Sequence, residues 1–386
     1  MTRWGDIARA VLDPITGRAP VGLESLLGDQ GRVAQSRNNP PLPTQDTALR
    51  NSVWWACLML RANVFSSFPV DVFRPVSGNP QLGTPVKAPP FFRNPAPGVS
   101  RTEWMFGTSM DLDRYGNSID IITQRNVYGK VTEVQPVTMG PNVRAVVDGT
   151  DRITHWRIGQ DEYAAADIWH QKQYTIKGMP LGLSTLAYSA YTMGIYNSAQ
   201  QFALDWFGMG ASPRGVLQSN KSDNISPEMR QAAKDAFKAA TMAGDIFVTG
   251  REWEWKPAAA DAMSTNFLMQ QAESSRDVCR FLGVPASMVD VEVTTGNITY
   301  ANITQANLQW LITQIGPGVN RMEQSWTEHA TPGPWYVKFN TSALLRMDDQ
   351  TRSTMLLAQL AGKARTPTEV RALDNLPPYT PEDLAE

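Results

Sequence analysis

The sequence predicts an α+β fold, in which a mostly antiparallel β region is set among long helices. Five short β-type runs, separated by turn signals, lie between residues 118 and 174. Before and after this region, apolar residues recur at helical spacing over long segments. With 386 residues, 42% hydrophobic content and 19% charge, the chain is globular and long enough to bury one large core or two smaller ones.

The N-terminal part is expected to contain an arm, two helices and a strand. Residues 1–45 carry Gly, Pro and scattered charge, which is typical of an arm or linker and compatible with disorder. Apolar residues between 47 and 68 predict a helix. Pro69 ends that helix, and residues 70–73 follow as a strand. A second helix is expected over residues 102–115.

The β region is expected to be antiparallel because its turns are short. Tyr128-Gly129 and Asp148-Gly149 are turn signals of the kind that join neighbouring strands. The expected strands are 119–123, 131–137, 143–147, 153–158 and 168–174.

The following part is mainly helical, with one small β element. Ser184 is placed to cap a helix that ends near Phe207. The triplet Ser226-Pro227-Glu228 is a helix start, with a cap residue, a proline in the first turn and an acid facing the helix dipole. Residues 246–248 and 253–255 predict a hairpin, which is marginal alone and needs neighbours to complete a sheet.

The last part is expected to contain a long broken helix. A helix from Phe267 ends in Phe281-Leu282-Gly283-Val284-Pro285, a polar loop follows, and helical spacing resumes at Tyr300. Gly316-Pro317-Gly318 is expected to kink or break this helix, because proline lacks the donor N–H and clashes one turn back. Further on, Thr366-Pro367-Thr368-Glu369 is a capping box.

The polar loop, Val293-Thr294-Thr295-Gly296-Asn297, contains neither an acid pair nor a histidine. Two long helices joined by a chemically inert loop suggest a mechanical part and not an active site. Its polar side chains are uncharged, whereas lysines would add a salt-dependent attraction for phosphate. The alternative is an ordinary two-residue turn between strands 291–293 and 298–300.

Most catalytic and metal-binding signatures are missing. His155, His170 and His329 lie far apart and are expected to be structural or surface residues. No zinc-protease, phosphate-loop or nucleophile-elbow motif occurs. Cys57 and Cys279 are expected to be buried, reduced thiols, with a bridge between them as the alternative.

One pair of acids, Asp111 and Asp113, has a catalytic appearance. Two carboxylates in a D-x-D arrangement can hold a divalent cation. A metal-dependent enzyme centred on them is therefore the alternative functional hypothesis. The simpler interpretation, which we favour, places both acids in solvent at the end of a helix.

Charge and hydropathy exclude several classes of protein. A formal charge of −2 argues against a wide basic face that grips nucleic acid. Trp253 and Trp255 share one face of their strand and could stack on bases, but the interleaved Glu252 and Glu254 favour a contact with protein. No run reaches the roughly 18 apolar residues of a membrane span, and residues 1–20 lack a continuous apolar segment. Neither a membrane partner nor a secretory signal is expected.

In order and spacing, several segments resemble the portal proteins of long-tailed double-stranded DNA bacteriophages, over about residues 47–380. The sequences that carry the resemblance are NSVWWAC at 51–57 with FPV at 68–70, GLSTL at 182–186, FGMGASPRGVL at 207–217, FLGVP at 281–285, LLRMD at 344–348 and the stretch 366–378. The family usually has a proline where this chain has Thr185, which affects only a local turn.

The resemblance implies a portal-type fold and a part for each segment. After the N-terminal arm at 1–45, the implied parts are a wing at 46–225, a stem helix at 226–243, a clip at 244–266, a second stem helix at 267–290, a tunnel loop at 291–298, a long broken helix returning to the wing at 299–345, and a crown at 346–386. The residues implied in function are Ile246, Val248, Trp253, Glu254 and Trp255 in the clip, Val293 to Asn297 in the tunnel loop, and Gly316, Pro317 and Gly318 at the helix kink.

The resemblance also implies a function without enzymatic activity or a cofactor. In the family, twelve copies form a ring at one capsid vertex, and a separate terminase ATPase pumps double-stranded DNA through it. The expected partners are further copies of the chain, the terminase large subunit, the head–tail connector, the major capsid protein and the scaffold. The expected location is the virion, after assembly in the host cytoplasm. A closed ring needs heterologous interfaces, for which helices with apolar stripes and many tryptophans (12 in this chain) are suited.

Overall fold

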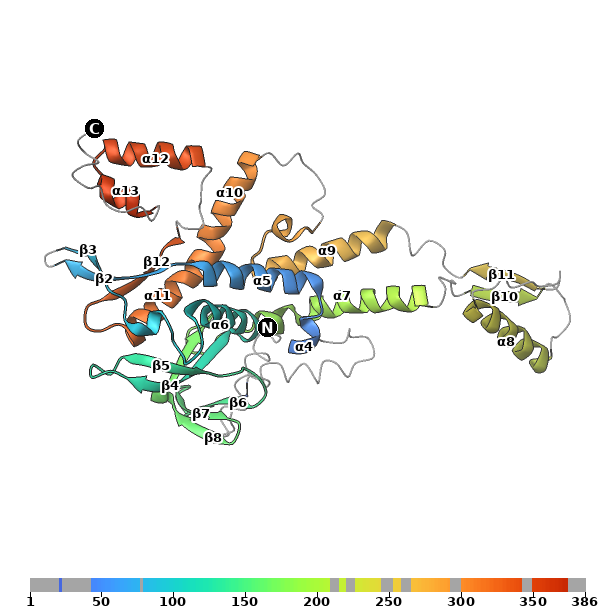
Figure 1. Cartoon of the computed structure of the whole chain (residues 1–386). Helices are drawn as coiled ribbons and strands as arrows, with labels where there is room; N and C mark the ends of the chain where they lie inside the picture. The colour runs from blue at the N-terminus through green and yellow to red at the C-terminus, as the bar shows by residue number, and fades with distance from the viewer. Residues whose placement is uncertain are drawn as a thin grey trace.

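The computed structural model describes residues 21–22, 43–76, 79–208, 215–219, 226–243, 253–257, 265–291, 300–341 and 349–373. Helices and small antiparallel sheets form one body, from which two long helices project (Figure 1). The α+β fold class is confirmed.

The first helical segment is divided in two by a cap. Helix α4 (Gln45–Ala48) is followed by α5 (Ser52–Ser67), and the backbone N–H of Trp54 donates to Asn51 Oδ1 at 2.9 Å. A single helix over 47–68 was expected, but the Asn51 side chain starts a new helix by satisfying a free N–H group. Helix α6 (Arg101–Tyr115) lies where the sequence predicts it and packs against α5.

One sheet joins distant parts of the chain. Strand β2 (Val70–Val76) lies between β3 (Asn79–Val86) and β12 (Tyr336–Phe339), and both pairings are antiparallel. The ring of Phe73 stacks on that of Tyr336 with centroids 5.7 Å apart. Strand β3 was not expected, because its two prolines and one glycine lower strand propensity, although they are tolerated at a sheet edge. The short β12 was not expected either.

The predicted β region forms two further antiparallel sheets. The first has the order β5 (Val131–Pro136), β4 (Asn117–Arg125), β9 (Ile168–Lys172). The second has the order β1 (Val21–Gly22), β6 (Val143–Val147), β7 (Ile153–Ile158), β8 (Asp161–Ala164). Strand β8 was missed. Residues 1–45 were expected to be an arm or linker. Within them, residues 21–22 instead form strand β1, in which Val21 pairs with Ala145.

Two long helices, α7 (Thr185–Gly208) and α9 (Thr265–Leu282), run side by side away from the body, and α5 also packs against α9 (Figure 1). The predicted cap of α7 is confirmed, since the Ala187 N–H donates to Ser184 Oγ at 3.2 Å. Between the two helices the chain forms β10 (Gly215–Ser219), α8 (Pro227–Ala243) and β11 (Trp253–Pro257). Figure 1 shows these three elements as a separate group beyond the ends of α7 and α9.

Strand β11 pairs with β10 in the described part of this group, with Trp255 opposite Leu217. The expected partner, residues 246–248, lies outside the described residues, and β10 was not expected from the sequence. The predicted start of α8 is confirmed by a bond from the Met229 N–H to Ser226 Oγ at 3.3 Å.

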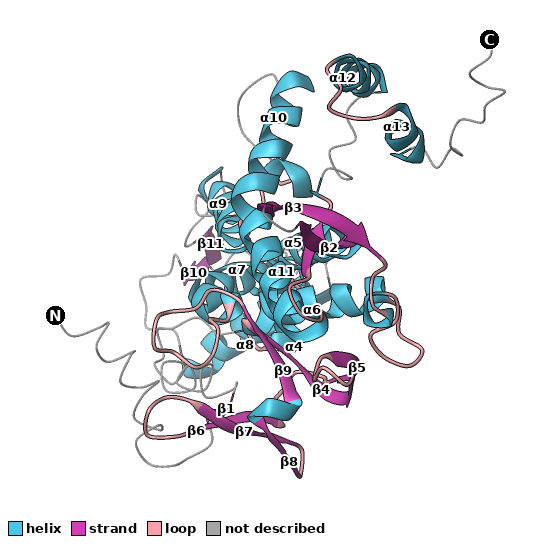
Figure 2. Cartoon of the chain, turned by 90° about the vertical axis from the view of Figure 1, so that its left-hand side faces the viewer, coloured by secondary structure: helices cyan, strands magenta, loops and turns pink. Residues whose placement is uncertain are grey.

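The C-terminal part is helical. A continuous helical segment contains α10 (Tyr300–Trp310), a π-helical turn (Leu311–Ile315) and α11 (Gly316–Ala330). Helices α12 (Asp349–Ala361) and α13 (Pro367–Leu373) lie apart from the body (Figure 2). The capping box is confirmed, because the Thr366 N–H donates to Glu369 Oε2 at 2.8 Å and the Glu369 N–H to Thr366 Oγ1 at 3.3 Å.

The expected break at Gly316-Pro317-Gly318 lies where the π-helical turn meets α11. Pro317 occupies the first turn of α11, where a missing N–H is tolerated. A Cβ added to Gly318 would lie 2.7 Å from Phe65 Cζ, so glycine permits the close approach of α11 to α5. A bend of the helix axis stays a prediction.

The core of the body is rich in aromatic side chains. Trp326 lies in its centre, with ring centroids 5.2 Å from Trp104 and 5.1 Å from Phe339. Other buried rings of this cluster include Phe91, Phe92 and Trp169. A smaller core around Trp156 holds the β6–β7 sheet against β4. Three short 3₁₀ helices complete the described elements, at Pro90–Phe92, Ala165–Asp167 and Ala286–Val289. Within the described ranges, no helix is long and apolar enough to span a bilayer.

Replacement of Gly116 by alanine is expected to destabilise the body. Gly116 ends α6 with a φ of +73°, and a Cβ there would lie 2.2 Å from the Leu183 carbonyl oxygen. We expect the unfolding free energy to fall by about 2–4 kcal/mol. Alanine disfavours the left-handed backbone at this position, and its Cβ would displace the segment around Leu183. Chemical denaturation measures the loss. Gly129→Ala is the control, because Gly129 has the same φ with nothing within 4 Å of the added atom. Equal losses in the two variants would refute the steric explanation.

Candidate functional site

The structure places the predicted functional residues in different regions. Val293 to Asn297 in the polar loop, and Ile246 and Val248 before β11, lie outside the described residues. Trp253, Glu254 and Trp255 form β11, where their backbones pair with β10. The best-described candidate site is therefore the junction between the helix that precedes the polar loop and the helix that follows it.

The helix before the polar loop contacts the far end of the helix that follows the loop. Helix α9 ends at Leu282, and Gly283 reverses the chain with a φ of +62°. The indole N–H of Trp310, at the end of α10, donates to the Gly283 carbonyl at 2.7 Å. A Cβ on Gly283 would lie 2.3 Å from Gln314 Oε1, so only glycine fits this approach without a shift. The helices before and after the loop therefore meet in a defined contact.

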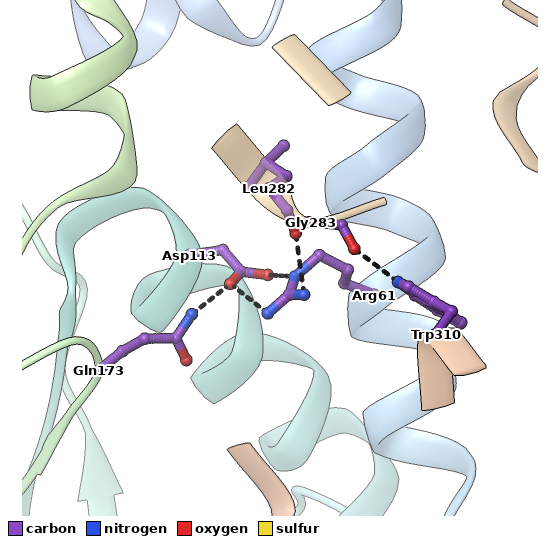
Figure 3. A network of polar contacts seen from close by, with 6 residues as sticks. All are labelled: Arg61, Asp113, Gln173, Leu282, Gly283 and Trp310. Carbon is purple, nitrogen blue, oxygen red and sulfur yellow. Dashed lines mark hydrogen bonds and ion pairs between the residues drawn. The ribbon is translucent and has the colours of Figure 1, made fainter. Parts of the chain in front are cut away.

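A buried polar network ties this junction to the body (Figure 3). The Arg61 guanidinium of α5 donates to both oxygens of Asp113 on α6, at 2.7 and 3.0 Å. Its third contact, at 3.0 Å, is to the Leu282 carbonyl at the end of α9. The Gln173 amide also donates to Asp113, at 2.7 Å. Arg61 thus connects helices α5, α6 and α9. Gln173 connects the segment after β9 to the same carboxylate.

The charges of this network are compensated inside the protein. Burial disfavours the Arg61 charge, but the attraction of Asp113 and its hydrogen bonds outweigh burial and raise the pKa of Arg61 above its ordinary value. Arg61 and Asp113 are each only 2% exposed. The bidentate geometry is of the strong, charge-assisted type. The pair therefore positions the end of α9.

The expectation that Asp111 and Asp113 are both solvated is wrong for Asp113. Residues two apart on a helix point about 200° apart, so the two carboxylates face different directions. Asp113 uses both oxygens in the network, and burial raises the pKa of the half-buried Asp111 to about 8. In the described ranges, no group of three or more His, Cys, Asp or Glu residues is arranged to hold a metal. The pair is a structural feature and not a cation site.

The two cysteines lie together in the core, as reduced thiols. The Cys57 and Cys279 sulfurs are 3.9 Å apart and link α5 to α9 by a weak hydrogen bond. The hydrogen bond to Cys279 and burial together raise the pKa of the Cys57 thiol above its ordinary value. The predicted buried, reduced state is confirmed, and Cys57 is not an activated nucleophile.

The histidines serve in packing. The His170 ring contacts Trp156, with its Nε2 2.9 Å from Asn117 Oδ1, and burial lowers the pKa of His170 to about 3. The His329 ring stacks on Trp169, with centroids 5.3 Å apart. His155 lies on the surface of β7. The structural role predicted for them is confirmed for the two that are packed in the body.

Asp120→Asn is expected to stabilise the protein at alkaline pH. Asp120 is 2% exposed, and burial raises its pKa from 3.8 to about 7, although the Trp104 indole donates to one of its oxygens at 3.1 Å. Between these two pH values the folded chain holds a proton that the unfolded chain lacks, so the Asp120 contribution to stability falls as pH rises to about 7.

An asparagine accepts the same indole hydrogen bond without charge. The asparagine variant should exceed wild type in unfolding free energy by about 2–4 kcal/mol at pH 8, and this difference should shrink toward zero near pH 4. Denaturation curves of both proteins at several pH values measure it. His170 has the opposite pH dependence, but it is present in both proteins and cancels in the difference. A pH-independent difference would contradict the prediction.

The family model described as "Phage portal protein" matches residues 52–375. The portal protein of Enterobacteria phage HK97 is 26% identical over 354 residues, which cover 87% of this chain and 81% of that protein. A probable portal protein of Streptomyces phage phiC31 is 20% identical over 402 residues, covering 97% and 84%.

Solved structures share the fold. A crystal structure of an HK97 family phage portal protein from Corynebacterium diphtheriae has a TM-score of 0.60 at 15% identity, covering 79% of this chain and 97% of that one. The neck of a native gene transfer agent particle, computed with C12 symmetry, has a TM-score of 0.56 at 18% identity and covers 90% and 99%. At these identities the two structures support the fold alone.

Proposed function

This chain belongs to the phage portal protein family, and we propose on that basis that its copies form a closed ring at one capsid vertex and that double-stranded DNA passes through the centre. Portal proteins are structural components of the capsid, so the chain is a structural subunit and not an enzyme. The observation that carries the proposal is the family match over residues 52–375, which extends from α5 to the C-terminal helices. The C12 neck of the gene transfer agent particle supports a ring of twelve.

We place the boundaries of stem and clip differently from those implied by sequence. The stem is proposed to consist of α7 and α9, because these helices pack together and project from the body. The clip is proposed to include β10, α8 and β11, because they form one group at the end of the stem. The proposed wing contains the three sheets around α5 and α6, and the proposed crown contains α12 and α13.

We assign a separate partner to each part of the molecule. The clip, with Trp253 to Trp255, is assigned to the terminase large subunit during packaging and to the head–tail connector afterwards. The wing is assigned to the major capsid protein and the scaffold. The virion vertex is the proposed location, after assembly in the host cytoplasm. The loop Val293 to Asn297 is assigned to the channel, because it connects two helices, α9 and α10, that contact each other, and because its side chains are uncharged.

Electron microscopy of the purified protein tests the ring. Negative staining should show rings with a channel wide enough for a DNA duplex of roughly 20 Å, with a mass near twelve subunits. Mass photometry of the same sample gives the subunit number. Monomers that stay monomeric in the presence of scaffold protein would refute the proposal.

Shortening the loop tests the channel assignment. Deletion of Thr294 to Asn297 is expected to reduce DNA packaging strongly and leave ring assembly intact, because the contact between α9 and α10 lies outside the deleted residues. Packaged DNA is measured by nuclease protection, and rings are counted by microscopy. A deletion of equal length in the exposed turn at residues 126–129 is the control. Normal filling of heads by the deletion variant would exclude a role of this loop in translocation.

A further inference from the structure

The two cysteines of the chain face each other across the contact of α5 and α9. The Cys57 Sγ lies 3.9 Å from the Cys279 Sγ. This distance exceeds an S–S bond of about 2.05 Å by roughly 2 Å, which is of the size that rotation of two side chains about their Cα–Cβ bonds can change. The sequence contains no third cysteine, so no other thiol of the chain competes for either sulfur.

The sulfur pair lies beside a polar contact of the same two helices. Cys57 and Arg61 are one turn apart on α5, and Cys279 and Leu282 are one turn apart on α9. The Arg61 guanidinium donates to the Leu282 carbonyl at 3.0 Å. A covalent bond between the sulfurs would therefore join two segments that already pack together.

The hydrogen bond between the sulfurs makes the two thiols chemically unequal. Cys57 donates to Cys279, and this bond lowers the pKa of the Cys279 thiol and raises the pKa of the Cys57 thiol. The thiolate is the nucleophilic form of cysteine. Cys279 is therefore the sulfur that reacts first with an oxidant, and Cys57 is the thiol that resolves the product.

We propose that Cys57 and Cys279 form a disulfide bond when the chain passes from a reducing to an oxidising environment, and that this bond clamps α9 to α5. With hydrogen peroxide as the oxidant, the Cys279 thiolate attacks one oxygen and breaks the O–O bond. The hydroxide that leaves takes up the proton that Cys279 has released, and Cys279 becomes a sulfenic acid.

The Cys57 sulfur completes the reaction by attacking the Cys279 sulfur. The S–O bond breaks, and the departing hydroxide leaves as water with the Cys57 proton. In sum, two thiols and one peroxide give one disulfide and two waters. The 3.9 Å separation favours this second step over further oxidation, because the resolving thiol is already in place.

The first step requires a local opening, because the closed structure shields both sulfurs. Cys57 is 0% exposed and Cys279 is 2% exposed. Hydrogen peroxide is little larger than water and reaches Cys279 when the end of α9 separates from α5. The Arg61 bond to the Leu282 carbonyl and the Trp310 bond to the Gly283 carbonyl oppose this separation. The rate of oxidation should therefore follow the opening of the junction.

The proposed function supplies both environments. Cytoplasm keeps thiols reduced during assembly, whereas a free virion is exposed to an oxidising medium. The bond would join residues 222 positions apart, so it would constrain the unfolded chain and stabilise the fold after release. This role in the particle rests on the proposed function, but the sulfur chemistry is testable on the unassembled chain.

The chemistry is tested on purified, unassembled wild-type protein that is treated with hydrogen peroxide while folded. Thiols are then alkylated in denaturant and counted by mass spectrometry. Both thiols should disappear together, the peptides that contain Cys57 and Cys279 should be recovered as one cross-linked pair, and dithiothreitol should restore both thiols. Thiols that stay reduced, a sulfinic acid at Cys279 or a bond between two chains would overturn the proposal.

The clamp is tested by thermal unfolding. The oxidised wild-type protein should melt about 3–8 °C above the reduced protein. Cys57→Ser is the control, because its remaining thiol has no partner in the chain, and peroxide should not raise its melting temperature. A disulfide that forms without raising the melting temperature of the wild-type protein would overturn the stabilising role of the bond.

The access route is tested with a variant of the junction network. Asp113→Asn removes the counterion of Arg61, so the end of α9 should open more often and the disulfide should form at least about tenfold faster. Rates are compared at a temperature where circular dichroism shows that both proteins are folded. Arg152→Gln, at an exposed arginine of β7's preceding turn, should leave the rate unchanged. Equal rates for Asp113→Asn and wild type would overturn the assigned route.

The change of environment is tested on assembled particles. An alkylating reagent added to intact cells should trap both thiols of the assembled chain in reduced form, whereas particles recovered from the medium should contain the disulfide. The same sulfur state in both samples would overturn the role in the particle. Absence of the chain from the particles would count against the proposed function instead, and the peroxide experiment still decides the sulfur chemistry.

Discussion

Asp113→Asn is expected to lower the unfolding free energy by about 3–5 kcal/mol, because it leaves the Arg61 charge buried without a counterion. The side chain keeps its shape, so the loss reports the charge and not a cavity. Both residues are 2% exposed, and the guanidinium makes two bonds to the carboxylate that it cannot replace with water. Because Arg61 also holds the Leu282 carbonyl, the end of α9 should loosen as well.

Chemical denaturation at a protein concentration where wild type and variant are both unassembled gives the free energy, since assembly would add its own stabilisation. Hydrogen exchange of the Val284 N–H, which bonds to Cys279 at the end of α9, reports the local loosening. The double variant Arg61→Met with Asp113→Leu is the control. It removes both charges and should recover most of the loss. An unchanged denaturation midpoint for Asp113→Asn would show that Arg61 finds another partner.

Trp326→Ala is expected to cost about 3–5 kcal/mol, because it empties the centre of the aromatic core. Trp326 is 1% exposed and contacts rings from three other parts of the chain, namely Phe92, Trp104 and Phe339. The other elements cannot close the cavity without moving the β12–β2 sheet, to which Phe339 belongs. The sheet that joins residues 70–76 to 336–339 should therefore be weakened first.

The matched control is Trp55→Ala on α5, where 47% of the tryptophan is exposed, and its expected cost is less than about 1 kcal/mol. Trp326→Phe is a second variant. It retains a ring and removes an indole N–H that has no partner within the described part of the chain, so its cost should be well below that of alanine. Denaturation followed by circular dichroism measures all three. Similar losses for Trp326→Ala and Trp55→Ala would contradict the central role of Trp326.

Local features of this fold are readable in the sequence because their causes lie within a few residues. Ser184, Ser226 and Thr366 cap their helices as predicted, since a cap needs only a side-chain oxygen and the N–H two or three residues on. Five strands of the β region, β4 to β7 and β9, were found for the same reason, because β-type residues and turn signals mark them locally, whereas the short β8 was missed. The order of these segments was also sufficient for the resemblance to phage portal proteins.

The missed elements depend on partners far along the chain. Strand β12 is short and becomes a strand by pairing with β2, and β10 pairs with β11 across the intervening α8. Asp113 was expected in solvent, because nothing in its own segment shows that Arg61, 52 residues earlier, lies opposite. Gly318 was assigned to a kink, and its contact with Phe65 is visible only after α11 packs on α5. Helix caps and hydrophobic periodicity depend on residues close together in the sequence, so the sequence alone determined them. The tertiary structure decided which charges pair, which strand edges meet and which surfaces pack, because these depend on segments that are distant in sequence and meet only in space.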